Sequence, residues 1–364
     1  MTALLKKRIP SLDGMRAASI LMVIIGHAFG KQIRCIDFAN LGVLVFFIIS
    51  AYLIVGILSN DVAKGRFSVG SFYFKRLTRT LPAFYIYLII VFFLLRSLSL
   101  FDWQQFMPSV FFLEDYHPRY LWNDRQWFTG HTWSLAVEEQ FYFLIAFVFL
   151  FLNKKIITEK QVLNILVMIV FLVPLIRISY MFINAIPEFL RGSLHRSFET
   201  VADSLAVGGI LALRQEKIIR SQIFLFFKNK IWLLILIIML LQMCNSSWTV
   251  ATFGLAPRYF YNLIGLCGVN ICTGLLLLHV IHFSGENAFA KFLNTPVMIK
   301  IGLWSYSIYL WQQVWLYTWD MPLAYKLAGI LICSVASYYL IEKTVLAWRD
   351  GVISRQKFRR YSCQ

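Results

Sequence analysis

The stretch LGVLVFFIISAYLIVGIL, Leu41 to Leu58, decides the fold, because it is long, apolar and free of charged side chains. A run of about 18 such residues is enough to cross the bilayer hydrocarbon as one α-helix. Similar runs recur along the 364-residue chain, which is 59% hydrophobic and only 15% charged. Soluble globular proteins are about 25% charged, so the composition excludes that class. We expect one membrane-embedded, all-α bundle.

Hydropathy predicts about ten transmembrane helices. We interpret the basic amino terminus and the apolar core after it as an uncleaved first span. Val201–Leu213 is the weakest span, since it is short, rich in glycine and contains Asp203. The expected spans are Met15–Phe29, Leu41–Leu58, Leu81–Leu100, Phe141–Leu152, Val162–Ile183, Val201–Leu213, Ile231–Cys244, Phe260–Val280, Ile301–Thr318 and Leu323–Leu346.

The distribution of charge predicts the orientation of these helices. Cytoplasmic loops accumulate Lys and Arg, so both termini are expected in the cytoplasm. The net charge of +17 is then explained by topology and by anionic lipid head groups, and we expect no nucleic-acid partner. We divide the chain into a transmembrane domain, 1–348, and a basic cytoplasmic tail, 349–364. Lys and Arg are concentrated in the amino terminus, the loops 59–80, 153–161, 214–230 and 281–300, and the tail.

One long polar insertion interrupts the series of spans, from Phe101 to Gln140 on the expected external side. It contains four Trp residues, which makes it too aromatic for a disordered segment. Loops of this length in a compact bundle are usually functional. We expect it to pack back onto the bundle as a lid or a substrate wall.

Arg16 and His27 are ionisable residues inside the first expected helix. Eleven residues at about 100° each place both side chains on one helix face, and the rise separates them by roughly 16 Å. Charged and titratable groups are costly at membrane depth and suggest function. Arg16 could instead extend to the inner interface, and His27 could be a packed histidine.

Lys75, Arg76 and Arg79 directly precede the third span. The i, i+3 spacing of the two arginines predicts a cationic ledge at the cytosolic face. Guanidinium groups bind phosphates through paired hydrogen bonds, so the ledge suits a phosphate-bearing cytosolic ligand. The alternative is an ordinary basic flank that sets topology.

Glu138 and Glu139 lie at the external mouth of the fourth expected span. A carboxylate beside His27 would orient the imidazole and raise its basicity, as a general base requires. Adjacent residues on a helix point about 100° apart, so at most one of the two is expected to face His27. Which one does so is open, as is the alternative of two interfacial carboxylates.

Other polar residues lie in the later spans. Asp203 is near the external face, and Tyr306 and Gln313, with Ser305 and Tyr309, can bind a sugar or join helices. The sequence contains no zinc-ligand spacing, phosphate-binding loop or hydrolase elbow, so no metal site is predicted.

Five segments together resemble, in the same order, the acyltransferase-3 family of membrane O-acyltransferases. The resemblance covers about Ile9 to Leu346, and its most specific parts are the Arg-x10-His pair, the Arg-x-x-Arg pair and WSLAVEEQFYF. Family members often have His where this chain has Gln312 or Gln313, and Pro where it has Thr344. The segments are LDGMRAASILMVIIGHAF, RLTRTLP, WSLAVEEQFYF, DSLAVGGILA and SYSIYLWQQ.

The resemblance implies an enzyme of the bacterial inner membrane. Such enzymes transfer an acyl group, most often acetyl, from cytosolic acyl-CoA to a hydroxyl of a cell-surface or exported glycan. Known acceptors of the family include O-antigen, exopolysaccharide, peptidoglycan and lipo-oligosaccharides. The implied partners are acyl-CoA, a glycan or lipid-linked oligosaccharide and membrane lipids, and no metal is needed.

The resemblance also implies roles for single residues. His27, oriented by Glu138 or Glu139, would act as the base or first accept the acyl group itself, and these alternatives stay open. Arg16 would assist Lys75, Arg76 and Arg79 in holding the coenzyme A phosphates while the pantetheine arm extends toward His27. The residues expected to contact the acceptor are Trp133, Ser134, Asp203, Tyr306 and Gln313.

A carrier is the alternative function. In that case His27 and the carboxylates would form a proton relay, and the arginines would line an anion path. No inverted repeat is visible in the sequence, and the long aromatic loop suits a sugar platform better. A purely structural membrane protein would leave Arg16 and His27 unexplained.

Overall fold

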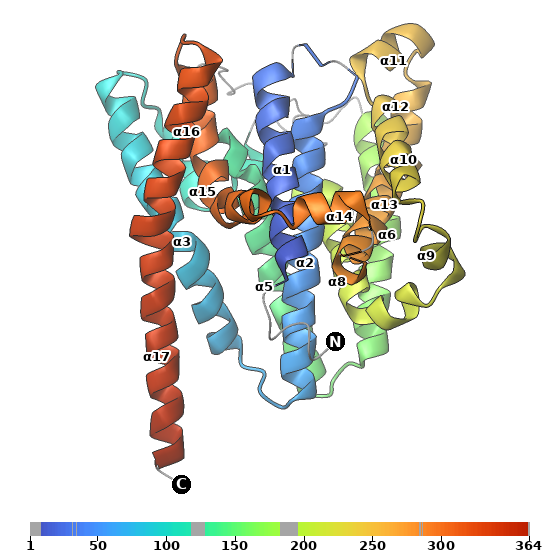
Figure 1. Ribbon diagram of the computed structural model, residues 1–364, viewed down its shortest axis with the longest axis vertical. Helices are drawn as coiled ribbons and strands as arrows, with labels where there is room; N and C mark the ends of the chain where they lie inside the picture. The colour runs from blue at the N-terminus through green and yellow to red at the C-terminus, as the bar shows by residue number, and fades with distance from the viewer. Residues whose placement is uncertain are drawn as a thin grey trace.

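The computed structural model describes residues 9–30, 32–33, 35–117, 128–182, 196–283, 285 and 287–362. All the regular structure in these ranges is helical, and no strand occurs in them (Figure 1). The predicted all-α fold class is therefore confirmed for the described residues. The last residue of the expected fifth span, Ile183, lies outside them.

Where the structure describes them, most connections between consecutive helices are short. Two π-helical segments, η5 (Tyr261–Gly265) and η6 (Tyr338–Glu342), continue directly into the helices on either side of them. The α-helices are α1 (Pro10–Phe29), α2 (Phe38–Ala63), α3 (Val69–Ser97), α4 (Trp103–Val110), α5 (Trp133–Asn153), α6 (Glu159–Phe182), α8 (Phe198–Ile219), α9 (Gln222–Phe226), α10 (Ile231–Met243), α11 (Ser247–Phe253), α12 (Ala256–Phe260), α13 (Leu266–His282), α14 (Ala288–Leu293), α15 (Pro296–Thr318), α16 (Leu323–Ser337) and α17 (Lys343–Ser362).

Each of the ten expected spans lies on a helix of the described chain, but not all of these helices qualify as membrane spans. Seven are long and apolar enough, and an eighth forms if α10 and α11, bent by 62°, are taken together. The helices α8 and α15 fall short because polar side chains such as Asp203 and Gln312 occupy their inner faces. The count of ten and the cytoplasmic placement of both termini therefore stay predictions.

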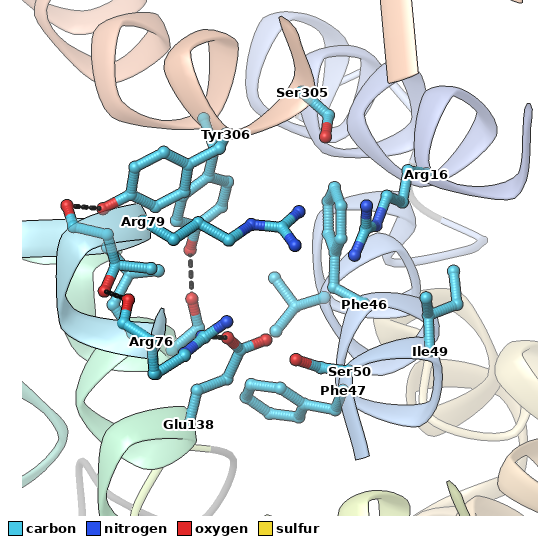
Figure 2. Close-up of a pocket in the computed structure, with 15 residues that line it drawn as sticks. Arg16, Phe46, Phe47, Ile49, Ser50, Arg76, Arg79, Glu138, Ser305 and Tyr306 are labelled. Carbon is cyan, nitrogen blue, oxygen red and sulfur yellow. Dashed lines mark hydrogen bonds and ion pairs between the residues drawn. The ribbon is translucent and has the colours of Figure 1, made fainter. Parts of the chain in front are cut away.

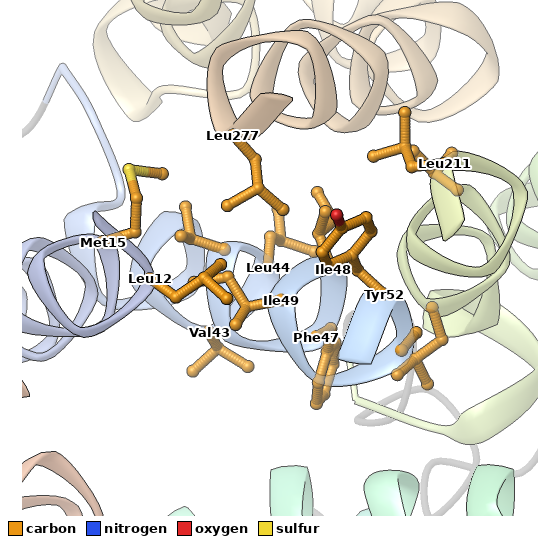
Figure 3. Packing of buried hydrophobic residues seen from close by; sticks show 14 of the residues in the cluster. Leu12, Met15, Val43, Leu44, Phe47, Ile48, Ile49, Tyr52, Leu211 and Leu277 are labelled. Carbon is orange, nitrogen blue, oxygen red and sulfur yellow. The ribbon is translucent and has the colours of Figure 1, made fainter. Parts of the chain in front are cut away.

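The helices α1 and α2 form the centre of the molecule (Figure 1). Of the apolar window of α2, 78% is buried, against 22% for the window of the peripheral α16–α17 helix. α1 packs between α2 and α15, and the opposite side of α2 packs on α8. Figure 3 shows the resulting core, in which Leu12 and Met15 of α1 lie beside Val43 and Leu44 of α2.

Two glycines allow α1 to approach its neighbours closely. A Cβ atom on Gly302 of α15 would lie 1.9 Å from the backbone oxygen of Asp13, and one on Gly42 of α2 would lie 2.6 Å from that of Ser19. Small residues are what such close helix pairs in membranes require, because backbones then meet directly. The helix α1, which carries Arg16 and His27, is therefore held tightly against both α2 and α15.

The insertion from Phe101 to Gln140 packs back onto the bundle, as predicted, in the residues that the structure describes. Phe106, Phe128 and His131 are buried, and the Tyr87 hydroxyl of α3 donates to the Phe128 carbonyl at 2.7 Å. The insertion forms α4 and two short 3-10 turns, η2 (Glu114–Tyr116) and η4 (Gly130–Thr132). Residues 118–127 lie outside the described ranges.

The carboxyl-terminal helix extends beyond the rest of the bundle. α16, η6 and α17 make one long helix whose end lies apart from the other helices (Figure 1). The expected boundary between 348 and 349 falls within α17, where the helix continues without a break. Residues 363 and 364 of the predicted tail lie outside the described ranges.

Candidate functional site

A cavity of about 80 Å³ lies among five helices and is lined by six of the twelve predicted site residues. It is formed by α1, α2, α3, α5 and α15 (Figure 2). Its charged lining residues are Arg16, Arg76, Arg79 and Glu138. Its polar neutral lining residues are Ser50, Thr80, Ser134, Ser305, Tyr306 and Tyr309.

Arg76 is held in place by acidic and aromatic groups of α5. Its Nη2 lies 3.1 Å from Glu138 Oε2 and its Nε lies 3.4 Å from Glu139 Oε1. The guanidinium carbon lies 3.9 Å from the centre of the Tyr142 ring, and the Tyr142 hydroxyl donates to Glu138 Oε2 at 2.9 Å. These contacts balance the charge of Arg76, so its main role is to shape the wall of the cavity.

Arg16 and Arg79 differ from Arg76, because their charges are poorly balanced. The two guanidinium groups point toward each other across the cavity (Figure 2), and their charges repel. Arg16 has Asp13 at 3.9 Å. Within the described part of the chain, Arg79 makes no hydrogen bond and no ion pair, and it is exposed. An anion between them would relieve the repulsion and accept hydrogen bonds from both.

His27 lies at the other end of α1, which is one unbroken helix as predicted. Its Nδ1 lies 2.8 Å from Oε1 of Gln312 in α15, and its ring packs edge-on against Tyr317, with centroids 5.7 Å apart. An amide oxygen can only accept, so Nδ1 carries the hydrogen. The lone pair of the neutral ring is therefore on Nε2, the position that a general base uses.

The expected partnership of His27 with Glu138 or Glu139 is wrong. α5 begins at Trp133, eight residues before the expected start of the span, so the two glutamates lie inside the helix and not at its external mouth. Both face α3, where Arg76 binds them. The side chain that orients the imidazole is a neutral amide, Gln312.

Tyr309 joins the cavity to the His27 region. It lines the cavity, its hydroxyl donates to the His131 carbonyl at 2.6 Å, and the same hydroxyl lies 2.6 Å from Ser134 Oγ. Ser305, Tyr309 and Gln312 have i, i+4, i+7 spacing and share one face of α15. This face runs beside α1 from the level of Arg16 to that of His27.

Six predicted site residues do not line the cavity: His27 and Glu139, described above, and four others. Lys75 is exposed on α3, and its carbonyl accepts from Arg349 Nη1 and from Thr78 Oγ1. Trp133 packs on Phe47. Gln313 is buried at 5% exposure. Asp203 is fully buried and forms an ion pair with Arg177 at 2.9 Å, apart from the lining residues.

Two functional contacts were not predicted. Tyr142 follows Glu138 by one helical turn, so the spacing could have shown that both reach the same partner. The contact of Gln312 with His27 could be found only from the tertiary structure, because no spacing rule relates residues 285 positions apart. In the described ranges, no group of three or more His, Cys, Asp or Glu side chains could hold a metal ion.

Residues 9–341 match a family model described as an acyltransferase domain, Acyl_transf_3. The chain is similar to O-acetyltransferase OatA of Staphylococcus aureus strains COL and MRSA252, with 27% identity over 319 residues in each case, 84% of this chain and 50% of the relative. A further Staphylococcus aureus protein, provisionally named an O-acetyltransferase, is 30% identical over 325 residues. The chain spans about half the length of these curated relatives. No solved structure matches it significantly.

Proposed function

The chain belongs to the Acyl_transf_3 family of acyltransferase domains, and we propose that it is an O-acyltransferase that takes an acyl group, acetyl in the first instance, from cytosolic acyl-CoA. The acceptor is a hydroxyl of a glycan on the outer side of a bacterial inner membrane. The observation that carries the proposal is the pair of facing guanidinium groups, Arg16 of α1 and Arg79 of α3, together with His27 at the other end of α1, whose Nδ1 is bonded to Gln312.

The charges of Arg79 and Arg16 indicate where the phosphates of the donor bind. Coenzyme A carries phosphates, and Arg79 is exposed, lacks a partner among the described residues and faces a second guanidinium. Binding a phosphate there replaces repulsion with charge-assisted hydrogen bonds. Arg76 is already neutralised by Glu138 and Glu139, so it positions the wall and contributes less to phosphate binding.

The distance between Arg16 and His27 is similar to the length of the pantetheine arm of the donor. Arg16 and His27 are about 16 Å apart along the helix axis. An extended pantetheine arm bridges much of that length, following the α15 face that carries Ser305 and Tyr309. The thioester then lies near the imidazole, while the phosphates stay at the arginines.

The reaction needs only one base. His27 Nε2 takes the proton from the acceptor hydroxyl as its oxygen attacks the thioester carbonyl. The carbon–sulfur bond breaks, the coenzyme A thiolate leaves, and the imidazolium returns the proton to it. Gln312 accepts the Nδ1 hydrogen throughout and keeps the ring in the reactive tautomer. The family match favours this chemistry over a carrier.

The test uses the full chain in proteoliposomes with radiolabelled acetyl-CoA. Arg79→Ala should raise the KM for acetyl-CoA about 10- to 100-fold, the loss expected for one or more charge-assisted hydrogen bonds. Lys75→Ala is the matched control, because Lys75 has the same charge one turn earlier on α3 but does not line the cavity. It should change KM by less than about twofold.

His27→Ala should lower kcat about 100-fold or more while acetyl-CoA still binds. Binding is measured by displacement of labelled coenzyme A. The proposal fails if correctly folded His27→Ala and Arg79→Ala proteins both transfer acetyl groups at the wild-type rate.

A further inference from the structure

Glu342 is a buried carboxyl group beside the cavity lined by Arg16 and Arg79, and the proposed reaction does not use it. It is the last residue of the π-helical segment η6 and is 7% exposed. η6 packs against α3, the helix that carries Arg79. Glu342 accepts a hydrogen bond from the hydroxyl of Ser307, a fully buried residue of α15. The carboxyl group is therefore fixed between two of the helices that form the cavity.

The charge of Glu342 acts on Arg79. Arg16 and Arg76 repel the Arg79 guanidinium, whereas the Glu342 carboxylate attracts it. Glu342 also interacts electrostatically with Tyr306, which lines the cavity together with Arg79 (Figure 2). Within the described part of the chain, Arg79 and Glu342 form no direct ion pair, so the attraction acts across a gap.

The other two arginines of the cavity are held more closely. Each has a carboxylate oxygen near its guanidinium, at 3.1 Å for Arg76 and at 3.9 Å for Arg16. The Arg79 guanidinium is exposed and ends a long side chain with many rotamers, so it can shift toward either of two anions. Glu342 and a bound phosphate thus compete for the same guanidinium.

This competition affects how tightly the donor site holds coenzyme A. The affinity for a ligand falls when the side chain that binds it spends part of its time in another arrangement. The donor and the released coenzyme A have the same phosphates, so a contact at Arg79 holds both equally and does not favour the transition state. A weaker phosphate contact therefore speeds release of the product, a step that limits turnover in many enzymes.

We infer that Glu342 is a positioning residue that draws Arg79 away from the phosphate site, lowers the affinity for coenzyme A and speeds its release. The inference rests on the proposed function, because it takes the phosphates of coenzyme A as the ligand of Arg79. The hydrogen bond from Ser307 limits the effect, since it holds the carboxyl group apart from Arg79.

The first test measures binding of labelled coenzyme A to the full chain in proteoliposomes, without any acyl transfer. Glu342→Gln keeps an oxygen that accepts from Ser307 and removes the charge. The Kd for coenzyme A should fall about 3- to 10-fold, because one competing charge near the guanidinium is removed. Most of the change should appear as slower dissociation. An unchanged or higher Kd overturns the inference, since loss of a purely structural residue would not increase the affinity.

A second variant should change the affinity in the opposite direction. Ser307→Ala keeps the charge of Glu342 and removes the hydrogen bond that holds it apart from Arg79, so the Kd should rise about threefold or more. An unchanged or lower Kd overturns the inference, also if Glu342→Gln does not fold. Glu216→Gln is the matched control, because Glu216 is exposed on α8 and does not line the cavity. Its Kd should change by less than about twofold, and a fall equal to that of Glu342→Gln would assign the effect to net charge and overturn the inference.

The second test asks whether Glu342 acts through Arg79. In an Arg79→Ala background, Glu342→Gln should change the Kd for coenzyme A by less than about twofold. A fall of the same size as in the wild-type background overturns the role assigned to Glu342. If wild-type protein binds coenzyme A and Glu342→Gln changes neither the Kd nor the dissociation rate, the inference fails and the proposed function stands. If wild-type protein binds no coenzyme A, both fail.

Discussion

Gln312 decides which nitrogen of the His27 ring is available. A carboxylate was expected in this place, but the amide oxygen accepts the Nδ1 hydrogen without adding a charge to the membrane interior. Gln312 is fully buried, so water does not compete for the contact. In the proposed reaction Gln312 would act through His27, as a positioning residue.

Gln312→Leu should lower kcat about 10- to 100-fold with little change in the KM for acetyl-CoA, because the ring loses its orientation and the donor site is unaffected. Gln312→Glu keeps an acceptor oxygen and should recover most of the rate. Steady-state kinetics on both variants checks this. Equal losses in the two variants would show that packing, not the hydrogen bond, is what Gln312 supplies.

Asp115 lies outside the membrane spans, in η2 of the folded insertion. Burial raises the pKa of its carboxyl from 3.8 to about 7, although Gln140 Nε2 donates to both of its oxygens. The nearby Glu199 carboxylate also raises the pKa. The folded state therefore holds a proton that the unfolded state releases near pH 4, and stability falls as pH rises from about 4 to about 7.

The apparent melting temperature should be a few degrees lower at pH 8 than at pH 5.5 for this reason. Asp115→Asn stays neutral and can still accept from Gln140, so its difference between the two pH values should be smaller. Thermal unfolding in detergent at both pH values measures the effect. The same difference in wild type and variant would assign the pH dependence to other groups.

At the scale of elements, the two π-helical segments lie where polar groups meet inside the bundle. In η5 the carbonyl of Asn262 accepts from Arg177 Nε at 3.0 Å, and in η6 Glu342 accepts a hydrogen bond from Ser307 of α15. A π turn changes which backbone and side-chain groups point inward. In η5 the acceptor is a backbone carbonyl that a regular helix would use in its own hydrogen bonds, whereas in η6 it is a side-chain carboxylate.

Asp203 belongs to the first of these networks, because Arg177 joins α6, α8 and η5 through Asp203, the Thr200 carbonyl and the Asn262 carbonyl. Asp203→Asn or Arg177→Met alone should destabilise the protein by about 3 to 5 kcal/mol, since each leaves an unpaired buried group. The double variant Arg177→Met with Asp203→Leu should be closer to wild type. Thermal stability and transfer activity are both measured.

This comparison also tests the predicted contact of Asp203 with the acceptor. If Asp203 has only a structural role, the stable double variant should retain acyl transfer. A stable but inactive double variant would instead support the contact with the acceptor.

At the scale of the whole molecule, the cavity lined by Arg16 and Arg79 and the cavity lined by Gly26 and Asp37 lie toward opposite ends of α1. The predicted orientation places the first toward the cytoplasm and the second toward the outside. A donor and an acceptor could then approach from opposite sides without either crossing the bilayer.

The orientation can be tested with single thiols in intact cells. Cys35 lies in the connection after α1 and is exposed, so a membrane-impermeant maleimide should label it from outside. In a background in which Cys35 and Cys363 are both replaced by Ser, Ser354→Cys in the exposed part of α17 should be labelled only after permeabilisation. The reverse pattern would invert the topology and, with it, the sides assigned to donor and acceptor.

The sequence by itself determined the helical fold, the family and most of the arginine site. Apolar runs such as Leu41 to Leu58 can satisfy their backbone in lipid only as helices, and the spacing from Arg16 to His27 follows from the helix alone. Only the tertiary structure decided which side chains the charged and polar residues of these helices contact. Arg76 binds Glu138 and Glu139, His27 binds Gln312, and Asp203 binds Arg177. The physical reason is that helical periodicity defines a face, whereas the neighbour of that face depends on how separate helices pack, which close contacts such as that at Gly302 determine.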